Sequence, residues 1–322
     1  VVGVSIFVIV FYGIGLFMPW QFLTNTTSAF DVAVVHTAYN VLATMVLIPS
    51  RQIWVKLAYK ILPETQEKEK EVLLDELLLG TPAVALQQAR EVAAKMAETA
   101  QHSMVLASGL IENFDPKVAD GIRDLEDKAD VYEDALGSYL VKVSACDLNQ
   151  KDSEQVTKLL HIIGDLERIS DHAVNIVESA EEIKEKKIEF SADAQAELAT
   201  LRRAVGDIIG YAESAFINND VEMAIEIEPL EQVVDDLRDQ IKLNHIKRLQ
   251  KSECTIEHGF ILSDMLNNFE RVSDHCSNIG CCVIEISTDD SLDLHKYLHQ
   301  IKSDSEVFQK KYKEYTDKYS IN

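Results

Sequence analysis

The stretch that decides the fold reads DLERISDHAVNI at residues 165–176, and it returns as NFERVSDHCSNI at residues 268–279. Seven of the twelve positions are identical, and Glu167 in the first copy stands 103 residues before Glu270 in the second. Two similar stretches at a fixed spacing indicate a repeated structural unit. We therefore expect the same unit to occur twice in this chain.

A second pair of stretches precedes the first and supports the same repeat. It reads LEDKADVYED at residues 125–134 and LEQVVDDLRD at residues 230–239, with 105 residues from Glu126 to Glu231. Each unit has room for about three long helices. Long helices joined by short loops form an antiparallel bundle, so we expect two three-helix bundles in tandem.

The residues around these stretches have the pattern of helices. Apolar residues recur three and four positions apart, and nothing beyond residue 82 alternates with a period of two over a useful length. One apolar stripe consists of Leu159, Ile163, Leu166, Ile169, Ala173, Val177 and Ala180. The expected helices lie near residues 83–113, 116–146, 152–186, 192–218, 220–251 and 254–287, followed by a charged, Tyr-rich helix from about Leu292 to Tyr319. The predicted fold class is all-α.

Charge is distributed unevenly along the 322 residues, whose formal net charge is −23. Residues 1–50 contain one charged side chain, Asp31, and residues 51–62 add three basic ones. Residues 63–322 therefore hold 53 of the 54 acidic and 28 of the 31 basic side chains, a net charge of −25. This acidic body argues against nucleic acid as a ligand, because a phosphate backbone needs a basic surface.

Two apolar stretches, residues 1–18 and 32–48, predict a transmembrane helical hairpin, since a span needs roughly 17–25 apolar residues. Basic residues follow the second stretch, and by the positive-inside tendency this end is cytoplasmic. We expect a multi-pass protein of the cell (inner) membrane, with residues 1–62 at the end of its membrane domain. A buried apolar hairpin of a soluble protein is the alternative. Since the chain does not begin with Met, we expect it to be a fragment of a longer protein.

Polar residues interrupt the second apolar stretch at a helical spacing. His36, Asn40 and Thr44 recur every four residues, which places them on one face of a helix. Polar groups inside a membrane normally face a bundle interior or a wet pathway. The spacing is compatible with hydrogen bonds between helices and with a role in transport.

Each repeat carries two acidic doublets of the form Glu-x-x-x-Asp. The eight residues are Glu126, Asp130, Glu167, Asp171, Glu231, Asp235, Glu270 and Asp274. Four-residue spacing places both carboxylates on one helix face, where like charges cost roughly 0.2–0.5 kcal/mol per pair. Two doublets on adjacent helices would supply four carboxylates to a cation such as iron, manganese, magnesium or calcium. We therefore predict a metal site in each bundle.

Six further residues would extend these sites or orient their ligands by hydrogen bonding. They are Asp134, Asn175, Asp239, Asn278, His172 and His275. The alternative is a solvated acidic face balanced by Arg168 and Arg271, since charged helix faces are usually just hydrated. Four doublets at matched repeat positions favour metal, because a solvated face needs no such register.

Other motifs argue against an enzyme. None of the nine histidines has a glutamate three residues before it, as di-iron bundles require. A Walker A loop, a nucleotide fingerprint and a nucleophile elbow are also absent from the sequence. The five cysteines form no C-x-x-C pair, and an odd number on the cytoplasmic side indicates reduced thiols.

At LERISDHAVNI and FERVSDHCSNI, with LEDKAD and LEQVVD upstream, the chain resembles the duplicated signature of PhoU-like domains over roughly Pro82–Ile286. That resemblance implies two three-helix bundles that bind metal through their Glu/Asp-x-x-x-Asp motifs and regulate phosphate uptake. Iron, zinc or manganese is the expected metal. The implied boundaries are a linker at residues 63–81, a PhoU-like domain at 82–290 (repeats 82–187 and 190–288) and a C-terminal helix at 291–322.

The preceding residues, from His36-Thr-Ala-Tyr-Asn40 to Pro49, resemble the end of the membrane domain of sodium/phosphate cotransporters. The resemblance implies the C-terminal portion of a sodium-dependent phosphate symporter. Its partners would be sodium and phosphate, through membrane helices absent from this chain, together with other phosphate-signalling proteins and a second copy in a homo-oligomer. The Gln-Ser-Ser-type substrate motifs of that family do not occur here. The alternative is a membrane-anchored, metal-binding PhoU-like regulator that acts on a separate phosphate transporter or signalling partner.

Overall fold

The computed structural model describes residues 36–37, 40–41, 44, 74–287 and 306–321. The chain divides into two compact units, Val1–Glu69 and Lys70–Asn322, which are described separately. In the first unit, His36, Asn40 and Thr44 are helical and exposed, and the Thr44 hydroxyl donates a 2.7 Å hydrogen bond to the Asn40 carbonyl. Apart from these three residues and from Thr37 and Val41, the predicted membrane hairpin lies outside the described residues. Among the helices that are described, none is both long and apolar enough to cross a membrane.

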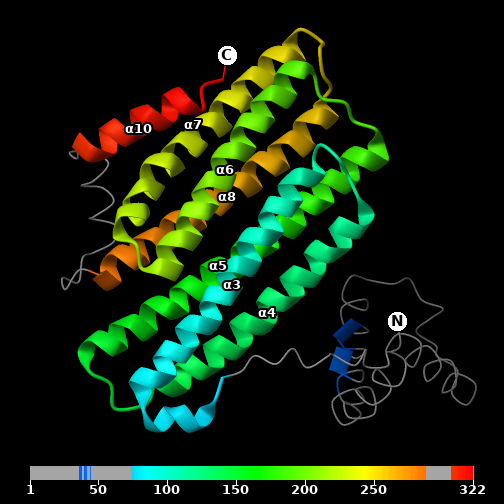
Figure 1. Ribbon diagram of the computed structural model, residues 1–322. Coiled ribbons are helices and arrows are strands. Elements are labelled where there is room, and N and C mark those ends of the chain that lie inside the picture. Colours follow the sequence, from blue (N-terminus) through cyan, green and yellow to red (C-terminus); the bar gives the residue numbers. More distant parts are fainter. Residues whose placement is uncertain (1–35, 38–39, 42–43, 45–73, 288–305, 322) are drawn as a thin grey trace, which may run out of the picture. The chain divides into compact units, whose positions relative to one another are not determined.

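The second unit is built from long helices (Figure 1). In the part of this unit that the structure describes, a short 3-10 helix, η2, precedes six long α-helices and a shorter one, α10. Their bounds are η2 Glu76–Gly80, α3 Pro82–Leu110, α4 Pro116–Ser144, α5 Gln150–Lys186, α6 Ala192–Asn218, α7 Val221–Gln250, α8 Ile256–Ser287 and α10 Glu306–Lys318. The described residues contain no strand, so the all-α prediction is confirmed for them, and the ends of α3–α8 lie within three residues of the predicted ones.

Side-chain caps determine where these helices begin. The Asp115 carboxylate accepts a hydrogen bond from the Lys117 amide at the start of α4, and the Asn149 side chain accepts one from the Asp152 amide at the start of α5. Such caps satisfy backbone donors that have no partner within the helix. At the other end, Lys187 and Asn219 adopt left-handed conformations, each with φ of 53°, which terminate α5 and α6.

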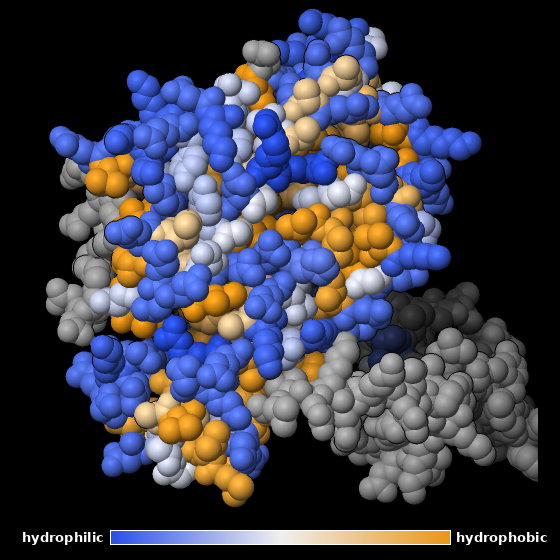
Figure 2. Space-filling view, in the orientation of Figure 1, coloured by the Kyte–Doolittle hydropathy of each residue, from blue (hydrophilic) through white to orange (hydrophobic). Residues whose placement is uncertain are grey.

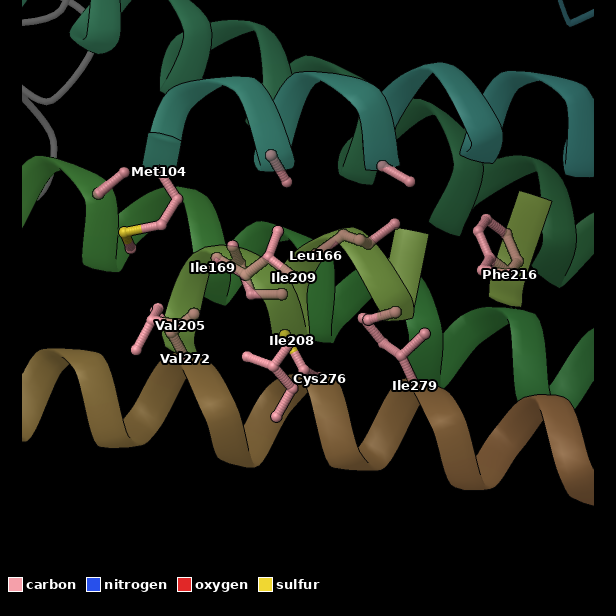
Figure 3. Packing of buried hydrophobic residues seen from close by; sticks show 14 of the residues in the cluster. Met104, Leu166, Ile169, Val205, Ile208, Ile209, Phe216, Val272, Cys276 and Ile279 are labelled. Carbon is pink, nitrogen blue, oxygen red and sulfur yellow. The ribbon is translucent and has the colours of Figure 1, made fainter. Parts of the chain in front are cut away.

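Helices α3, α4 and α5 pack together as one bundle, and α6, α7 and α8 as a second. The bundles meet through α5 against α8 and α3 against α6, and their buried residues form one hydrophobic cluster. Figure 3 shows Leu166 and Ile169 of α5 pointing into the same core as residues of α6 and α8. All seven residues of the predicted α5 stripe are buried. The two repeats therefore share a core rather than folding as separate domains.

The final helix, α10, packs against α7. Tyr315 donates a 2.9 Å hydrogen bond to Glu226 of α7, and Lys318 donates a 2.6 Å hydrogen bond to Asp207 of α6. Tyr319 also donates to Asp207 and is buried. The described part of this helix begins at Glu306, and the predicted part near Leu292 lies outside the described residues. Its tyrosine side chains donate hydrogen bonds to acidic groups of the second bundle, and Lys318 forms an ion pair with one of them.

The outer surface is largely hydrophilic in the view of Figure 2, with a band of apolar side chains across the middle of the visible face. A groove between α3 and α6, lined in part by Met104, Val105 and Ile209, is bordered by an ion pair between Arg202 and Glu112 at 2.5 Å. The predominance of hydrophilic side chains agrees with the acidic composition of this part of the chain.

Helix α8 offers a direct test of where the core lies. Phe269 is fully buried, whereas Phe260 on the same helix is 69% exposed. Replacing Phe269 with Ala should lower the free energy of unfolding by about 3–5 kcal/mol, because a large cavity is left in a shared core. Phe260→Ala should change it by less than about 0.5 kcal/mol. Urea denaturation of both variants measures this, and equal losses would contradict the assigned core.

Candidate metal centre

The first bundle gathers carboxylates on the facing sides of α4 and α5. Glu126 and Asp130 lie one turn apart on α4, and Asp171 faces them from α5. One carboxylate oxygen from each of these three residues lies within 4.8 Å of the other two. Among the described residues, this is the one group of His, Cys, Asp or Glu side chains that meets this separation. The structure thus assembles three of the eight predicted ligands into a single cluster.

The carboxylates of this cluster repel one another, and this repulsion contributes to raising their pKa values. Burial and the charges of Asp130, Asp127 and Asp171 raise the pKa of Glu126 above its ordinary value. Burial and the charge of Asp171 raise the pKa of Asp130 in the same way. Each shift means that the folded protein disfavours the ionised form. A cation at this position would reverse that effect.

Glu167, the fourth predicted ligand of this bundle, lies on α5 one turn before Asp171. Burial and the charge of Asp171 raise its pKa, with further contributions from Asp130 and Glu133 of α4 and an opposing one from Arg168. Glu167 therefore belongs to the same electrostatic cluster, although it is not among the three residues in closest contact.

The donor set fits a divalent cation. Carboxylate oxygens bind manganese, iron and zinc about 2.0–2.2 Å from the metal, which requires separations between ligand oxygens of up to roughly 4.4 Å. The oxygens of Glu126, Asp130 and Asp171 already lie close to that range. Because Glu126 and Asp171 are half-buried and Asp130 is exposed, small side-chain rotations would complete the coordination and water could supply further ligands.

Arg168 and Arg271, predicted as the balancing charges of a solvated face, do contact the doublets. Arg168 Nη1 lies 3.3 Å from Asp171 Oδ2, and Arg271 Nη1 lies 3.3 Å from Asp274 Oδ2. Both arginine side chains are more than 60% exposed. Exposed ion pairs contribute about 0–1 kcal/mol, so these arginines neutralise the clusters only in part.

The second bundle has the same doublets but a different arrangement. Glu231 is buried on α7, and Asp274 lies on α8, where burial and the charge of Glu270 raise its pKa. Arg238 of α7 lies between the two helices: its Nη1 is 2.8 Å from Glu270 Oε1 and 3.3 Å from Asp235 Oδ1. The guanidinium thus bridges the two helices through their doublets.

Sequence reasoning missed this arginine, although a signal was available. In the aligned stretches LEDKADVYED and LEQVVDDLRD, the ninth residue is Glu133 in the first and Arg238 in the second. The remaining α4 and α7 residues of the predicted sites also differ in their contacts. Asp134 contributes to the raised pKa of Asp130, whereas Asp239 accepts a 2.9 Å hydrogen bond from Arg238 Nε.

The predicted orienting residues of α5 and α8 lie at the contact between the bundles. His172 Nδ1 is 2.8 Å from Asn268 Oδ1, and Asn175 donates to the same oxygen at 3.2 Å. The second repeat mirrors this arrangement: its histidine, His275, is 2.8 Å from Asp165 Oδ1, and Asn278 donates to that oxygen at 3.1 Å. The two histidine rings are 5.6 Å apart. These residues therefore join α5 to α8.

All five cysteines are free thiols. The adjacent Cys281 and Cys282 are buried in α8, and burial raises the pKa of Cys282 to about 12. Burial also raises the pKa of Cys276. Thiolates are the metal-binding and reactive form of cysteine, so these three side chains act as apolar core residues.

A known protein family matches each of the two repeats separately. The family model described as PhoU domain matches residues 93–180 and again residues 198–283, together more than half of the chain. Among solved structures, PhoU from Streptococcus pneumoniae superimposes with a TM-score of 0.59 at 17% identity, covering 66% of this chain and 99% of that one. PhoU from Pseudomonas aeruginosa gives a TM-score of 0.54 at 20% identity, with coverage of 66% and 97%. These likenesses concern the fold.

Relatives by sequence fall into two kinds. The phosphate-specific transport system accessory protein PhoU homolog 1 of Thermotoga maritima is 27% identical over 156 residues, 48% of this chain and 66% of that protein. The putative inorganic phosphate export protein YjbB of Escherichia coli is 24% identical over 264 residues, 79% of this chain and 48% of that protein. The chain thus spans about half the length of the export-protein relative.

Neutralising one carboxylate tests the repulsion in the first bundle. With metal removed, Asp130→Asn should raise the free energy of unfolding at pH 7 by about 0.5 kcal/mol, because a like charge is lost from a helix face. The raised pKa of Asp130 destabilises the folded state only where the unfolded group is ionised. The difference between variant and wild type should therefore disappear as the pH falls below about 4.

Urea titrations of chelator-treated protein at several pH values measure this difference. Glu154→Gln, at an exposed position near the start of α5, is the control and should not raise stability. A loss of stability in Asp130→Asn at pH 7 would show that this carboxylate is favourably paired and would contradict the cluster.

Proposed function

Because the chain belongs to the PhoU domain family, we propose that its helical body regulates the movement of phosphate across a membrane. In the finer form of this proposal, the chain is the C-terminal part of a sodium-dependent phosphate symporter of the cell membrane. The body lies on the cytoplasmic side, binds metal ions through the first-bundle carboxylates and catalyses no reaction. The first statement, that the body regulates phosphate movement, is supported by the similarity to phosphate-transport accessory proteins and phosphate export proteins.

Two observations support a transporter: the likeness to a protein named for phosphate export, and the apolar composition of residues 1–62. The alignment with the Escherichia coli export protein covers 79% of this chain, about 254 residues, whereas the PhoU domain matches lie within the 191 residues from 93 to 283. The similarity is therefore longer than the segment that the PhoU domain model matches. Residues 1–62 are apolar and nearly uncharged, as expected for the end of a membrane domain.

Sodium coupling rests on the resemblance of His36-Thr-Ala-Tyr-Asn40 and the residues after it to sodium/phosphate cotransporters. The relative is named for export and the resemblance implies uptake, but one coupled carrier can run either way, since the ion and phosphate gradients set its direction. The proposal therefore concerns a coupled phosphate carrier, with uptake as the expected direction under an inward sodium gradient.

Metal binding gives the body a way to respond to conditions. Without a cation, Glu126, Asp130 and Asp171 repel one another across the contact between α4 and α5. A bound divalent ion would convert this repulsion into an attraction that draws the two helices together. Because both helices belong to the shared core, that change would be felt throughout the bundle.

Phosphate flux measured on the complete gene product tests the transporter part. Cells that lack their own phosphate transporters and express the complete protein should accumulate labelled phosphate in sodium medium, and much less when potassium replaces sodium. Accumulation that ignores sodium would remove the coupling from the proposal. If phosphate does not accumulate in either medium, the proposal that the protein is a phosphate transporter is contradicted.

The second outcome would favour a membrane-anchored regulator that acts on a separate transporter. The Thermotoga maritima relative, which is named an accessory protein, gives this alternative its support. Co-expression with a candidate transporter distinguishes the two proposals, because the alternative requires flux to appear only when that partner is present.

Metal content tests the regulatory part. Protein purified without chelator should retain iron, zinc or manganese, and the double change Glu126→Gln with Asp171→Asn should remove most of it, since two of three clustered carboxylates lose their charge. Glu185→Gln, on an exposed turn of α5, is the matched control and should retain the metal. Elemental analysis provides the measurement. Equal metal in the double variant and wild type would favour a merely solvated acidic face.

A further inference from the structure

The two bundles differ in what neutralises their carboxylates. In the second bundle, Arg238 Nη1 is 2.8 Å from Glu270 and 3.3 Å from Asp235, and its Nε is 2.9 Å from Asp239. The Arg238 side chain is 18% exposed, as is that of Glu270. One guanidinium thus contacts carboxylates of both α7 and α8, and little water screens the closest pair.

The first bundle has the opposite charge at the same place. Repeat alignment matches Arg238 with Glu133, and Glu270 with Glu167. Where Arg238 pairs with Glu270 in the second bundle, the matching positions of the first hold two residues of like charge, Glu133 and Glu167. The same pair of positions across the two helices is therefore an ion pair in one repeat and a repulsion in the other.

This single difference changes the balance of charge at each site. The first set has six carboxylates and one guanidinium, a formal charge of −5: Glu126, Asp130, Glu133, Asp134, Glu167, Asp171 and Arg168. The second has five carboxylates and two guanidinium groups, a formal charge of −3: Glu231, Asp235, Asp239, Glu270, Asp274, Arg238 and Arg271. A divalent ion bound to Asp235 and Glu270 would also have to share these ligands with the arginine, whose charge repels it.

We propose that Arg238 is the permanent internal cation of the second bundle, in the place that a dissociable metal ion takes in the first, so that this chain binds metal in its first bundle only. The proposal has two halves. The metal half, that the first bundle alone binds metal, rests on the proposed function. The arginine half, that Arg238 is the internal cation of the second bundle, does not. As a consequence, α7 and α8 are held together under all conditions, whereas the contact between α4 and α5 depends on metal. In this arrangement the first bundle responds to metal and the second bundle does not.

Melting temperatures test the arginine half without any metal. In the full chain, purified in detergent and treated with EDTA, Arg238→Gln should lower the melting temperature by about 5 °C, because it leaves a shielded carboxylate unpaired. Arg271→Gln is the matched control, since Arg271 also contacts Glu270 and Asp274 but is 62% exposed. It should lower the melting temperature by less than about 1 °C. Equal melting of the two variants would overturn the proposal.

Manganese binding tests the metal half. Equilibrium dialysis against Mn²⁺ alone should give the same bound Mn²⁺ per chain for wild type and for the double variant Asp235→Asn with Asp274→Asn. Arg238→Glu, which restores the residue type of the first repeat, should increase bound Mn²⁺ up to twofold, and Arg238→Gln should increase it to a smaller extent if the glutamate variant does not fold. A loss of bound Mn²⁺ in the second-bundle double variant would overturn the proposal. Wild type that binds no Mn²⁺ would instead contradict the metal part of the proposed function, while the melting temperatures still decide the role of Arg238.

Discussion

Repulsion between carboxylates on the facing sides of two helices is the constraint around which this body is built. Each repeat places Glu-x-x-x-Asp doublets on its second and third helices, and like charges one turn apart destabilise a helix. A cation between the two helices would remove that cost. In the second repeat Arg238 contacts Asp235 and Glu270 from within the chain, whereas in the first repeat the basic side chain that the described residues place on Asp171 is the exposed Arg168.

The two bundles can differ in this way because they are fixed to each other elsewhere. Helices α5 and α8 carry the same histidine and asparagine at matched positions, and each pair binds the acid or amide of the opposite repeat: His172 and Asn175 contact Asn268, and His275 and Asn278 contact Asp165. Apolar residues of α5, α6 and α8 fill one core beneath this contact. A change in the separation of α4 and α5 would therefore act on a core that both bundles share.

The sequence was sufficient for the helices, because their apolar stripes have a helical period and their ends carry capping residues such as Asp115 and Asn149. Four-residue spacing also predicted that Glu126 and Asp130 share one face of α4, and the structure brings Asp171 of α5 to that face. The sequence did not reveal the roles of His172 and His275, because a position about 100° around the helix from a ligand gives no indication of which neighbour lies there. Nor did matching the acidic residues reveal Arg238, whose role depends on a contact between helices that only the folded chain defines.

The position of a bound cation tests these proposals most directly. Crystals of the protein grown with Mn²⁺, measured at the manganese absorption edge, would locate it through anomalous scattering. The account predicts an anomalous peak between α4 and α5, coordinated by Glu126, Asp130 and Asp171, and none between α7 and α8, where the Arg238 guanidinium should lie against Glu270. A peak bound by Asp235 and Asp274, or the absence of one between α4 and α5, would contradict it.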